Sequence, residues 1–275
     1  MTNVLTIDDY DLREAREIAS SFGNDRFGYV VTPNVDHVIR HYYDPEFRNL
    51  YAHAAYVFLD SHFLAHLNGI LKRRRHRVTP GSDLTETLMS GVIKPHDKTV
   101  LVGGTAEQAQ ELRARFGFNA LQHIDPPMNF IRDEKAVEAC LREIEAASPF
   151  RFCFLAFGTP QQEIIALKLK ERGIARGLAL CVGASINFMT GAEKRAPHWI
   201  RRSGFEWLYR LARSPTRLAK RYLVRGPRIF LLLPHVELRL RRLVTMPGEA
   251  KPMPVNQPAP PTVTQPISAV TGTHG

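Results

Sequence analysis

The stretch that most constrains the fold runs from Phe150 to Glu163, where an apolar run stops at Gly158 and a polar cluster follows at once. Large apolar residues and a cysteine between Phe150 and Leu155 are typical of a strand that is covered on both faces. Pro160 suits the first turn of a helix that continues beyond Glu163. Because parallel sheets bind ligands at the carboxyl ends of their strands, this turn is either part of a functional site or a plain strand-to-helix connection.

The same arrangement of strand, polar or glycine-containing turn and helix recurs along the chain. Further strands are expected at 28–34, 56–60, 98–103, 120–124 and 178–183. Strands that alternate with helices predict an α/β fold with a Rossmann-like parallel sheet flanked by helices. At the two ends we expect an amphipathic helix over 8–22 and a helix over 229–243, kinked at Pro234, that either lies at a membrane interface or packs against the core.

Basic residues are concentrated near the C-terminus. The chain of 275 residues has a formal net charge of +10, and residues 194–242 hold fourteen Lys or Arg against two Glu. This concentration predicts an anionic partner, which could be a membrane surface, a nucleotide diphosphate or nucleic acid. The expected organisation is an α/β catalytic core at 1–192, a basic helical appendage at 193–245 and a disordered, proline-rich tail at 246–275.

Features at the N-terminus and the cysteines indicate the compartment. The first residues lack a cationic, apolar secretion signal, and no apolar run approaches the roughly 20 residues needed to cross a bilayer. Cys140, Cys153 and Cys181 are odd in number and show no CxxC spacing. We therefore expect a cytoplasmic protein whose cysteines are reduced thiols of the core.

Polar and glycine residues at the predicted strand ends are the candidate site residues. Thr32 and Asn34 could contact a ligand or merely cap the following helix. Asp60 ends an apolar strand, which makes it the best candidate for a general base, although it could also be a helix cap. Gly103 and Gly104 would let backbone N–H groups approach a phosphate or a ribose. Gly158 and Gln162 belong to the turn described above, which is either part of a site or a plain turn with solvated glutamines. Gly183 leaves space for a ligand or for a neighbouring backbone.

Acidic residues in two places have competing interpretations. The sequence Asp9-Tyr10-Asp11 matches the Asp-x-Asp metal motif of many sugar-nucleotide transferases. However, these acids stand at the start of the predicted helix, where the helix dipole favours negative charge, instead of following an apolar strand. Asp83 and Glu86 resemble a capping box, and Arg77, just before that helix, could face an anion or solvent.

Several short motifs follow one another in a fixed order. They are Thr32-Pro-Asn34, Asp60 after an apolar strand, Arg77 with Gly81-Ser-Asp83, Gly103-Gly104, Gly158-x-Pro160-x-Gln162-Glu163, Gly183-Ala, Arg195-Ala-Pro197, and Glu206-Trp-Leu-Tyr-Arg-Leu with Arg217 and Arg221-Tyr222. This series resembles the WecG/TagA/CpsF family of bacterial glycosyltransferases over about residues 27–226. Each motif is weak alone, but their order and spacing make coincidence improbable.

The resemblance implies an inverting transfer of a sugar, without a metal or other cofactor. The donor would be a UDP-sugar and the acceptor an undecaprenyl-diphosphate-linked sugar, in cell-surface or exopolysaccharide biosynthesis. The implied location is the anionic inner face of the cytoplasmic membrane, with peripheral association. Asp60 is implied as the base. The implied pocket residues are Thr32, Asn34, Arg77 and Gln162, and the implied cations for the leaving diphosphate are Arg210, Arg217 and Arg221.

Two departures from the family pattern concern the sugar that is transferred. The chain has Asp60-Ser61 where the family usually has Asp-Gly, and Gln161 where it often has Lys. Neither change removes a group that the transfer needs. The identities of the donor and acceptor sugars therefore stay open, and so does homo-oligomerisation.

Two other functions fit parts of the sequence. A nicotinamide-dependent oxidoreductase would use Gly103 and Gly104, but the third glycine of GxGxxG is missing and Asp125 only approximates the acidic residue expected about 20 positions on. A nucleotide- or nucleic-acid-binding protein would use the basic C-terminal region without sugar transfer. The family resemblance makes the transferase the preferred interpretation, with no nucleic-acid partner.

Overall fold

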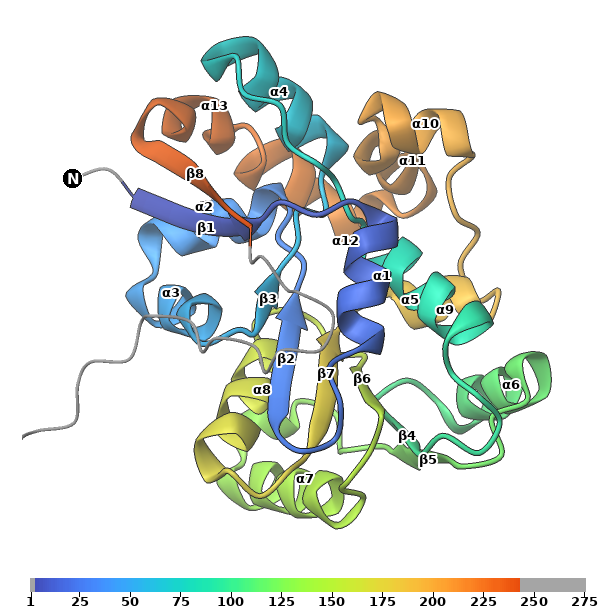
Figure 1. The fold of residues 1–275 in the computed structure, drawn as a ribbon. Helices are drawn as coiled ribbons and strands as arrows, with labels where there is room; N and C mark the ends of the chain where they lie inside the picture. The colour runs from blue at the N-terminus through green and yellow to red at the C-terminus, as the bar shows by residue number, and fades with distance from the viewer. Residues whose placement is uncertain (1–2, 243–275) are drawn as a thin grey trace, which may run out of the picture. The chain divides into compact units, whose positions relative to one another are not determined.

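A parallel sheet between two layers of helices forms the body of the protein (Figure 1). The structure is a computed structural model, and it describes residues 3–242. Within this range the sheet has six strands in the order β3-β2-β7-β6-β4-β5. The strands are β2 (Phe27–Val31), β3 (Tyr56–Val57), β4 (Thr99–Val102), β5 (Leu121–Ile124), β6 (Phe152–Leu155) and β7 (Gly177–Cys181). Every adjacent pair is parallel, which confirms the predicted α/β class.

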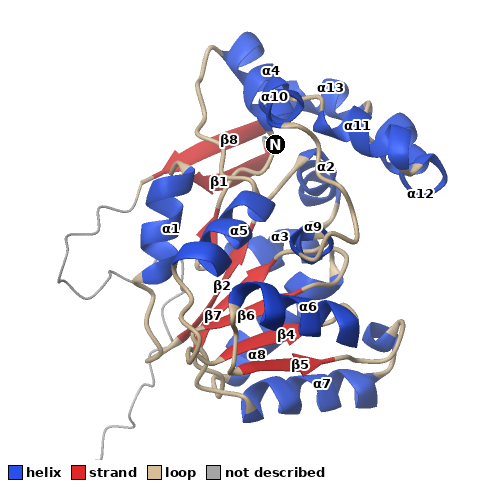
Figure 2. Cartoon of the chain, turned by 90° about the vertical axis from the view of Figure 1, so that its right-hand side faces the viewer, coloured by secondary structure: helices blue, strands red, loops and turns tan. Residues whose placement is uncertain are grey.

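Side chains alternate between the two faces along each strand, so that Tyr29 and Val31 join one apolar cluster and Val30 the other. The first cluster is covered by α2 (Val35–Tyr43), α3 (Pro45–Ala52), α4 (His62–Lys72), α7 (Glu134–Ala146) and α8 (Gln161–Arg172). The second is covered by α1 (Leu12–Ser20), α5 (Gly81–Gly91), α6 (Ala106–Phe116) and α9 (Ser185–Met189), as Figure 2 shows. Burial on both faces explains why the inner strands are almost continuously apolar, whereas the edge strand β5 contains Gln122 and His123.

The N-terminal helix is shorter than the sequence predicts. It begins after Asp11, whose side chain accepts a hydrogen bond of 3.0 Å from the backbone N–H of Glu14, while the Glu14 carboxylate accepts one from Asp11. This reciprocal capping fixes the helix start. The residues before it form a strand, β1 (Asn3–Asp8), which was not predicted from the sequence. Asp8, the first residue of the predicted helix, is the last residue of this strand.

The predicted helix over 229–243 is wrong in its second half. Helix α13 (Arg228–Leu232) is short, a 3-10 turn (Leu233–His235) contains Pro234, and the chain continues as strand β8 (Val236–Arg241). Proline ends the helix because it lacks a backbone donor. β8 pairs in parallel with β1, from Asn3 opposite Val236 to Asp8 opposite Arg241. The second half of the segment is therefore a strand whose Val236 and Leu238 pack in the core, and not a continuation of the helix.

The appendage is helical, as expected, before it reaches β8. It contains α10 (His198–Ser203), α11 (Glu206–Arg213), α12 (Pro215–Ala219) and a π-helical turn (Lys220–Arg225). Residues 1–243 form one compact unit, so the predicted core and appendage lie in the same unit. The predicted tail at 246–275 lies outside the described residues. In the part of the chain that is described, no helix is long and apolar enough to cross a membrane.

The three cysteines are buried and unpaired, as the sequence predicts. They are Cys140, Cys153 and Cys181. Burial raises the pKa of the Cys140 thiol to about 12 and raises that of Cys181 well above its ordinary value. These thiols stay protonated at neutral pH and act as small apolar residues of the core.

Candidate active site

A cavity of about 730 Å³ lies at the carboxyl ends of the parallel strands. One group of lining residues follows β2, β3, β6 and β7: Thr32, Asn34, Asp60, Gly158, Gln162 and Gly183. The appendage contributes another group: Arg201, Glu206, Trp207, Arg210, Arg221 and Tyr222. The volume is in the range of sites for small molecules and cofactors. The parallel sheet brings the strand ends to one edge, which is where open α/β sheets bind ligands.

Asp60 lies in this cavity and is only partly buried. Its Oδ1 accepts a hydrogen bond of 2.7 Å from the backbone N–H of Gly81. Burial raises the pKa of the Asp60 carboxyl to about 7; the bond from Gly81 opposes this rise, and the nearby Glu206 adds to it. A carboxylate with a pKa near neutrality can accept a proton at physiological pH, which is the property of a general base.

Arg221 connects the appendage to the start of α2. Its Nη2 donates to Oδ1 of Asn34 at 3.2 Å, and its Nε lies 3.9 Å from Oδ2 of Asp36. Asp36 is buried and also pairs with Arg40 at 3.1 Å. Asn34 caps α2 by accepting from the N–H of Asp36, so the capping role foreseen for it is real. The Arg221 side chain is thereby held where it lines the cavity.

The first helix of the appendage is held by Asp83. The carboxylate lies 2.5 Å from Nη2 of Arg195 and accepts from Nη1 of Arg201 at 2.7 Å. Arg195 also pairs with Glu86 at 3.2 Å. No side chain caps α5, so the capping box expected at Asp83 and Glu86 is wrong. Both acids instead bind arginines that come from a distant part of the sequence.

Gln162 is fixed by hydrogen bonds at both ends of its amide group. Its Oε1 accepts from the N–H of Gly183 at 2.9 Å, and its Nε2 donates to Oε1 of Glu163 at 3.0 Å. Glu163 is buried, accepts a further bond of 2.9 Å from Thr159, and has its pKa raised by burial. The second N–H of the Gln162 amide can be donated to a ligand in the cavity.

The two glycines after β4 differ in role. Gly104 lines the cavity, whereas Gly103 does not. Gly103 has a φ of +83°, and a Cβ at this position would lie 2.8 Å from the Phe157 ring. Gly103 therefore shapes the turn that brings Gly104 to the cavity, because only glycine adopts this backbone conformation without strain.

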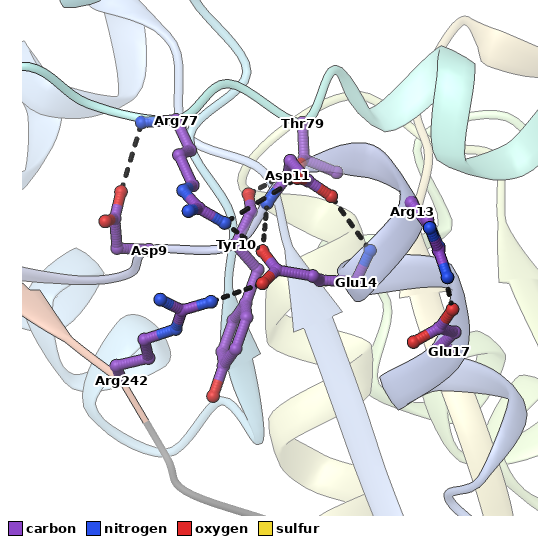
Figure 3. Close-up of polar contacts among 9 residues, drawn as sticks. All are labelled: Asp9, Tyr10, Asp11, Arg13, Glu14, Glu17, Arg77, Thr79 and Arg242. Atoms are coloured by element: carbon purple, nitrogen blue, oxygen red, sulfur yellow. Dashed lines mark hydrogen bonds and ion pairs between the residues drawn. The ribbon is translucent and has the colours of Figure 1, made fainter.

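The structure does not bring Arg77 to the cavity. Its guanidinium contacts Glu14 and lies 3.6 Å from Asp11, and its backbone N–H donates to Asp9 at 3.0 Å (Figure 3). Asp9 and Asp11 thus contact arginine, in place of the metal ion that an Asp-x-Asp motif would hold. The side chain of Arg217 lies outside what the structure describes. The remaining predicted site residues line the cavity: Thr32, Asn34, Asp60, Gly104, Gly158, Gln162, Gly183, Arg210 and Arg221.

Sequence reasoning missed several lining residues. The Trp207 and Tyr222 rings lie 5.9 Å apart, and the Arg210 guanidinium lies 5.6 Å from the Phe188 ring centroid. Glu206 is a second carboxylate near Asp60. The available signal was the presence of aromatic residues within a strongly basic segment, which is typical of binding surfaces for flat or anionic ligands.

The protein has a Rossmann-like α/β fold with a cavity of ligand size at the carboxyl edge of its parallel sheet. Residues 2–243 match the glycosyl transferase WecG/TagA/CpsF family. Because the match covers most of the chain, the protein belongs to this family and is a glycosyltransferase. It therefore uses a sugar donor and an acceptor, in agreement with the motifs in the sequence.

Proposed function

We propose that the protein transfers a hexose from a UDP-sugar to a sugar carried on undecaprenyl diphosphate, with inversion and without a metal ion. The product would serve cell-surface or exopolysaccharide biosynthesis. The observation that carries this proposal is that Asp60, Arg210 and Arg221 line one cavity. A single displacement needs a base that takes the proton of the attacking hydroxyl and cations that stabilise the leaving diphosphate, and this cavity offers both.

Each group has a defined part in the proposed reaction. The acceptor hydroxyl oxygen attacks the anomeric carbon, the bond from this carbon to the UDP oxygen breaks, and Asp60 takes the hydroxyl proton. A positioned base typically contributes about 10² to 10⁴ in rate. The guanidinium groups of Arg210 and Arg221 would bind the phosphate oxygens of the departing UDP, because their planar geometry allows two parallel hydrogen bonds.

A membrane-binding surface for the lipid-linked acceptor is proposed at the ends of α4 and α13. Ile70 is 77% exposed and Leu231 is 75% exposed, and basic residues follow at 72–75. The Phe63 and Phe230 rings lie 6.3 Å apart, so the two helices are neighbours. Both views place these helices at the end of the molecule that carries the appendage (Figures 1 and 2). Exposed apolar residues beside cations favour an anionic lipid surface.

The reaction is tested by mass spectrometry of a panel of UDP-sugars with short-chain polyprenyl-diphosphate sugars, with and without EDTA. We expect one donor to give product, at the same rate in EDTA. Absence of product from every pair would reject the proposed reaction, and loss of product in EDTA would reject metal independence. Stabilisation of the protein by UDP, and not by a nicotinamide dinucleotide, separates the transferase from the oxidoreductase.

The membrane surface is tested by co-sedimentation with vesicles that contain phosphatidylglycerol. We expect the paired change Ile70→Ser and Leu231→Ser to weaken binding at least tenfold. Met128→Ser is the matched control, because Met128 is 92% exposed and belongs to the loop after β5. Equal binding of all three proteins, or binding without anionic lipid, would reject this surface.

A further inference from the structure

We propose that Asp8 is a positioning residue for sugar transfer. By binding Arg241, Asp8 holds the C-terminal end of the appendage in place, and other arginines of the appendage line the cavity. The inference rests on the proposed function, because it takes this cavity as the active site. It concerns residues outside the cavity, at the two ends of the described chain.

The Asp8 carboxylate is completely buried and fully engaged. Its side chain is 0% exposed, its Oδ1 accepts from Nε of Arg241 at 2.6 Å, and its Oδ2 accepts from Nη2 of Arg241 at 2.9 Å. Oδ2 also accepts from the backbone N–H of Val57, in β3, at 2.8 Å. This paired arrangement is the most specific geometry that an arginine and a carboxylate can form. Asp8 thus connects the appendage to the central sheet.

The strand pairing around this bond is part of the core. Leu5 and Ile7 on β1 are buried, as are Val236 and Leu238 on β8. Among the described strands, β8 hydrogen-bonds only to β1. The last segment of the appendage therefore depends on the N-terminal strand for its backbone pairing, and the Asp8–Arg241 bond closes the end of that pairing.

The same N-terminal segment also holds the loop before Gly81, the residue whose backbone N–H donates to Asp60. Glu14 contacts both Arg242 and Arg77 (Figure 3). Oγ1 of Thr79 donates a hydrogen bond of 2.8 Å to the carbonyl of Tyr10. Thr79 lies two residues before Gly81, whose backbone N–H donates to Asp60. Residues 8–14 therefore contact both the end of the appendage and the loop that orients Asp60.

The appendage is thus fixed at both ends by aspartates. Asp83 binds Arg195 and Arg201 near its start, and Asp8 binds Arg241 at its end. Arg210 and Arg221 lie between these two attachments. If the second attachment is lost, the segment can open locally while the central sheet stays folded. The cations would then be withdrawn from the leaving diphosphate.

Kinetics and proteolysis of Asp8→Asn and Arg241→Ala test this role. We expect each variant to lower kcat/KM at least tenfold, with an increased KM for the donor, and to speed tryptic cleavage within 193–242 while the α/β core resists digestion. Arg13→Ala is the matched control, because the Arg13–Glu17 pair is exposed and contacts neither β8 nor the loop (Figure 3). Wild-type kcat/KM and wild-type cleavage in both variants would overturn the inference.

A covalent replacement of the attachment distinguishes positioning from a general loss of stability. Thr6 and Arg239 are partners in the parallel register, and neither is buried. Neighbouring strands are about 4.8 Å apart, within the Cα separation of a disulfide. We expect the Thr6→Cys/Arg239→Cys bridge to restore kcat/KM to Arg241→Ala when oxidised, and dithiothreitol to abolish the rescue.

The bridge also covers the case in which a single variant fails to fold. It is introduced into the otherwise native chain as well, where oxidation should leave kcat/KM unchanged. A bridge confirmed by mass that restores neither activity nor protease resistance would refute the role of Asp8. If the native protein transfers no sugar at all, the proposed function fails, while the cleavage pattern still decides whether Asp8 holds the appendage.

Discussion

The backbone N–H of Gly81 donates a hydrogen bond to Oδ1 of Asp60, at 2.7 Å, and so orients the carboxylate at the end of β3. Among the described residues, no hydrogen bond reaches Oδ2 of Asp60. In the proposed reaction, this oxygen would take the proton of the acceptor hydroxyl. The loop that ends at Gly81 is itself held by a hydrogen bond of 2.8 Å from the N–H of Thr79 to the carbonyl of Leu59.

Asp60→Asn should abolish most of the catalysis without unfolding the protein. The amide oxygen can still accept from Gly81, but the side chain can no longer take a proton. We expect turnover to fall by about 10² to 10⁴, the range of a general base. Single-turnover product formation, followed by mass spectrometry, measures the loss. Turnover near that of the native enzyme would remove Asp60 from this role.

The activity should depend on pH through the same group. Asp60 must be ionised to accept a proton, and burial places its pKa at about 7. We expect kcat/KM to rise as the pH increases through 7 and to level off above it. The profile should be recorded with saturating acceptor from pH 5 to pH 9. A profile that is flat between pH 6 and pH 8 would contradict the prediction.

Stability should show the opposite trend with pH. The folded-state pKa of Asp60 lies above its ordinary value of 3.8, so the folded state binds the proton more tightly than the unfolded state. The stability associated with this proton is present below pH 3.8 and is lost as the pH rises to about 7. Asp60→Asn should therefore gain on the order of 1 kcal/mol relative to native protein between pH 5 and pH 8. Urea unfolding at both pH values measures the difference.

Arg221→Ala should weaken the binding of UDP and the stabilisation of the negative charge that develops on the leaving diphosphate. We expect kcat/KM to fall by roughly 10- to 10³-fold, as when one stabilising donor is removed from a developing anion. Arg213→Ala is the control, because Arg213 is an exposed arginine of α11 that does not line the cavity. Titration with UDP, followed by calorimetry, should show weaker binding only for Arg221→Ala. Equal effects of the two changes would point to net charge alone.

Alanine substitutions at two glycines distinguish an effect on folding stability from an effect on substrate binding. At Gly103 the φ of +83° and the Phe157 ring leave no room for a Cβ, so Gly103→Ala should cost about 1 to 3 kcal/mol of stability. At Gly158 no heavy atom lies within 4 Å of an added Cβ. Gly158→Ala should therefore keep the melting temperature and raise the KM. A lower melting temperature for Gly158→Ala alone would reverse this assignment.

Local sequence patterns were sufficient for the sheet and for most of the candidate site. Most strands of the central sheet are apolar runs, and polar residues such as Thr32 and Asp60 follow strand ends, so topology alone places them together. The cysteines were also predictable, because their apolar neighbours indicate burial.

Residues whose partners are distant in the sequence could not be predicted in this way. β1 and β8 pair across nearly the whole described chain. The β8 sequence alternates apolar and polar residues, Val-Glu-Leu-Arg-Leu-Arg, which is the pattern of a half-buried strand, but nothing local in the sequence identifies β1 as its partner. Arg77 and Asp83 were misassigned for the same reason. Their locations beside a helix start suggested a ligand and a cap, but their actual partners are Glu14 and the arginines of the appendage.

The pairing of β1 with β8 also has a consequence for biosynthesis. Of the described strands, β1 is translated first and must wait for β8, which is translated last, before its backbone can pair. A nascent chain that stops before Arg241 has a finished central sheet but an unattached basic segment. The enzyme would therefore become competent only after nearly all of residues 3–242 have been translated, so sugar transfer would begin only once both ends of this range have been made.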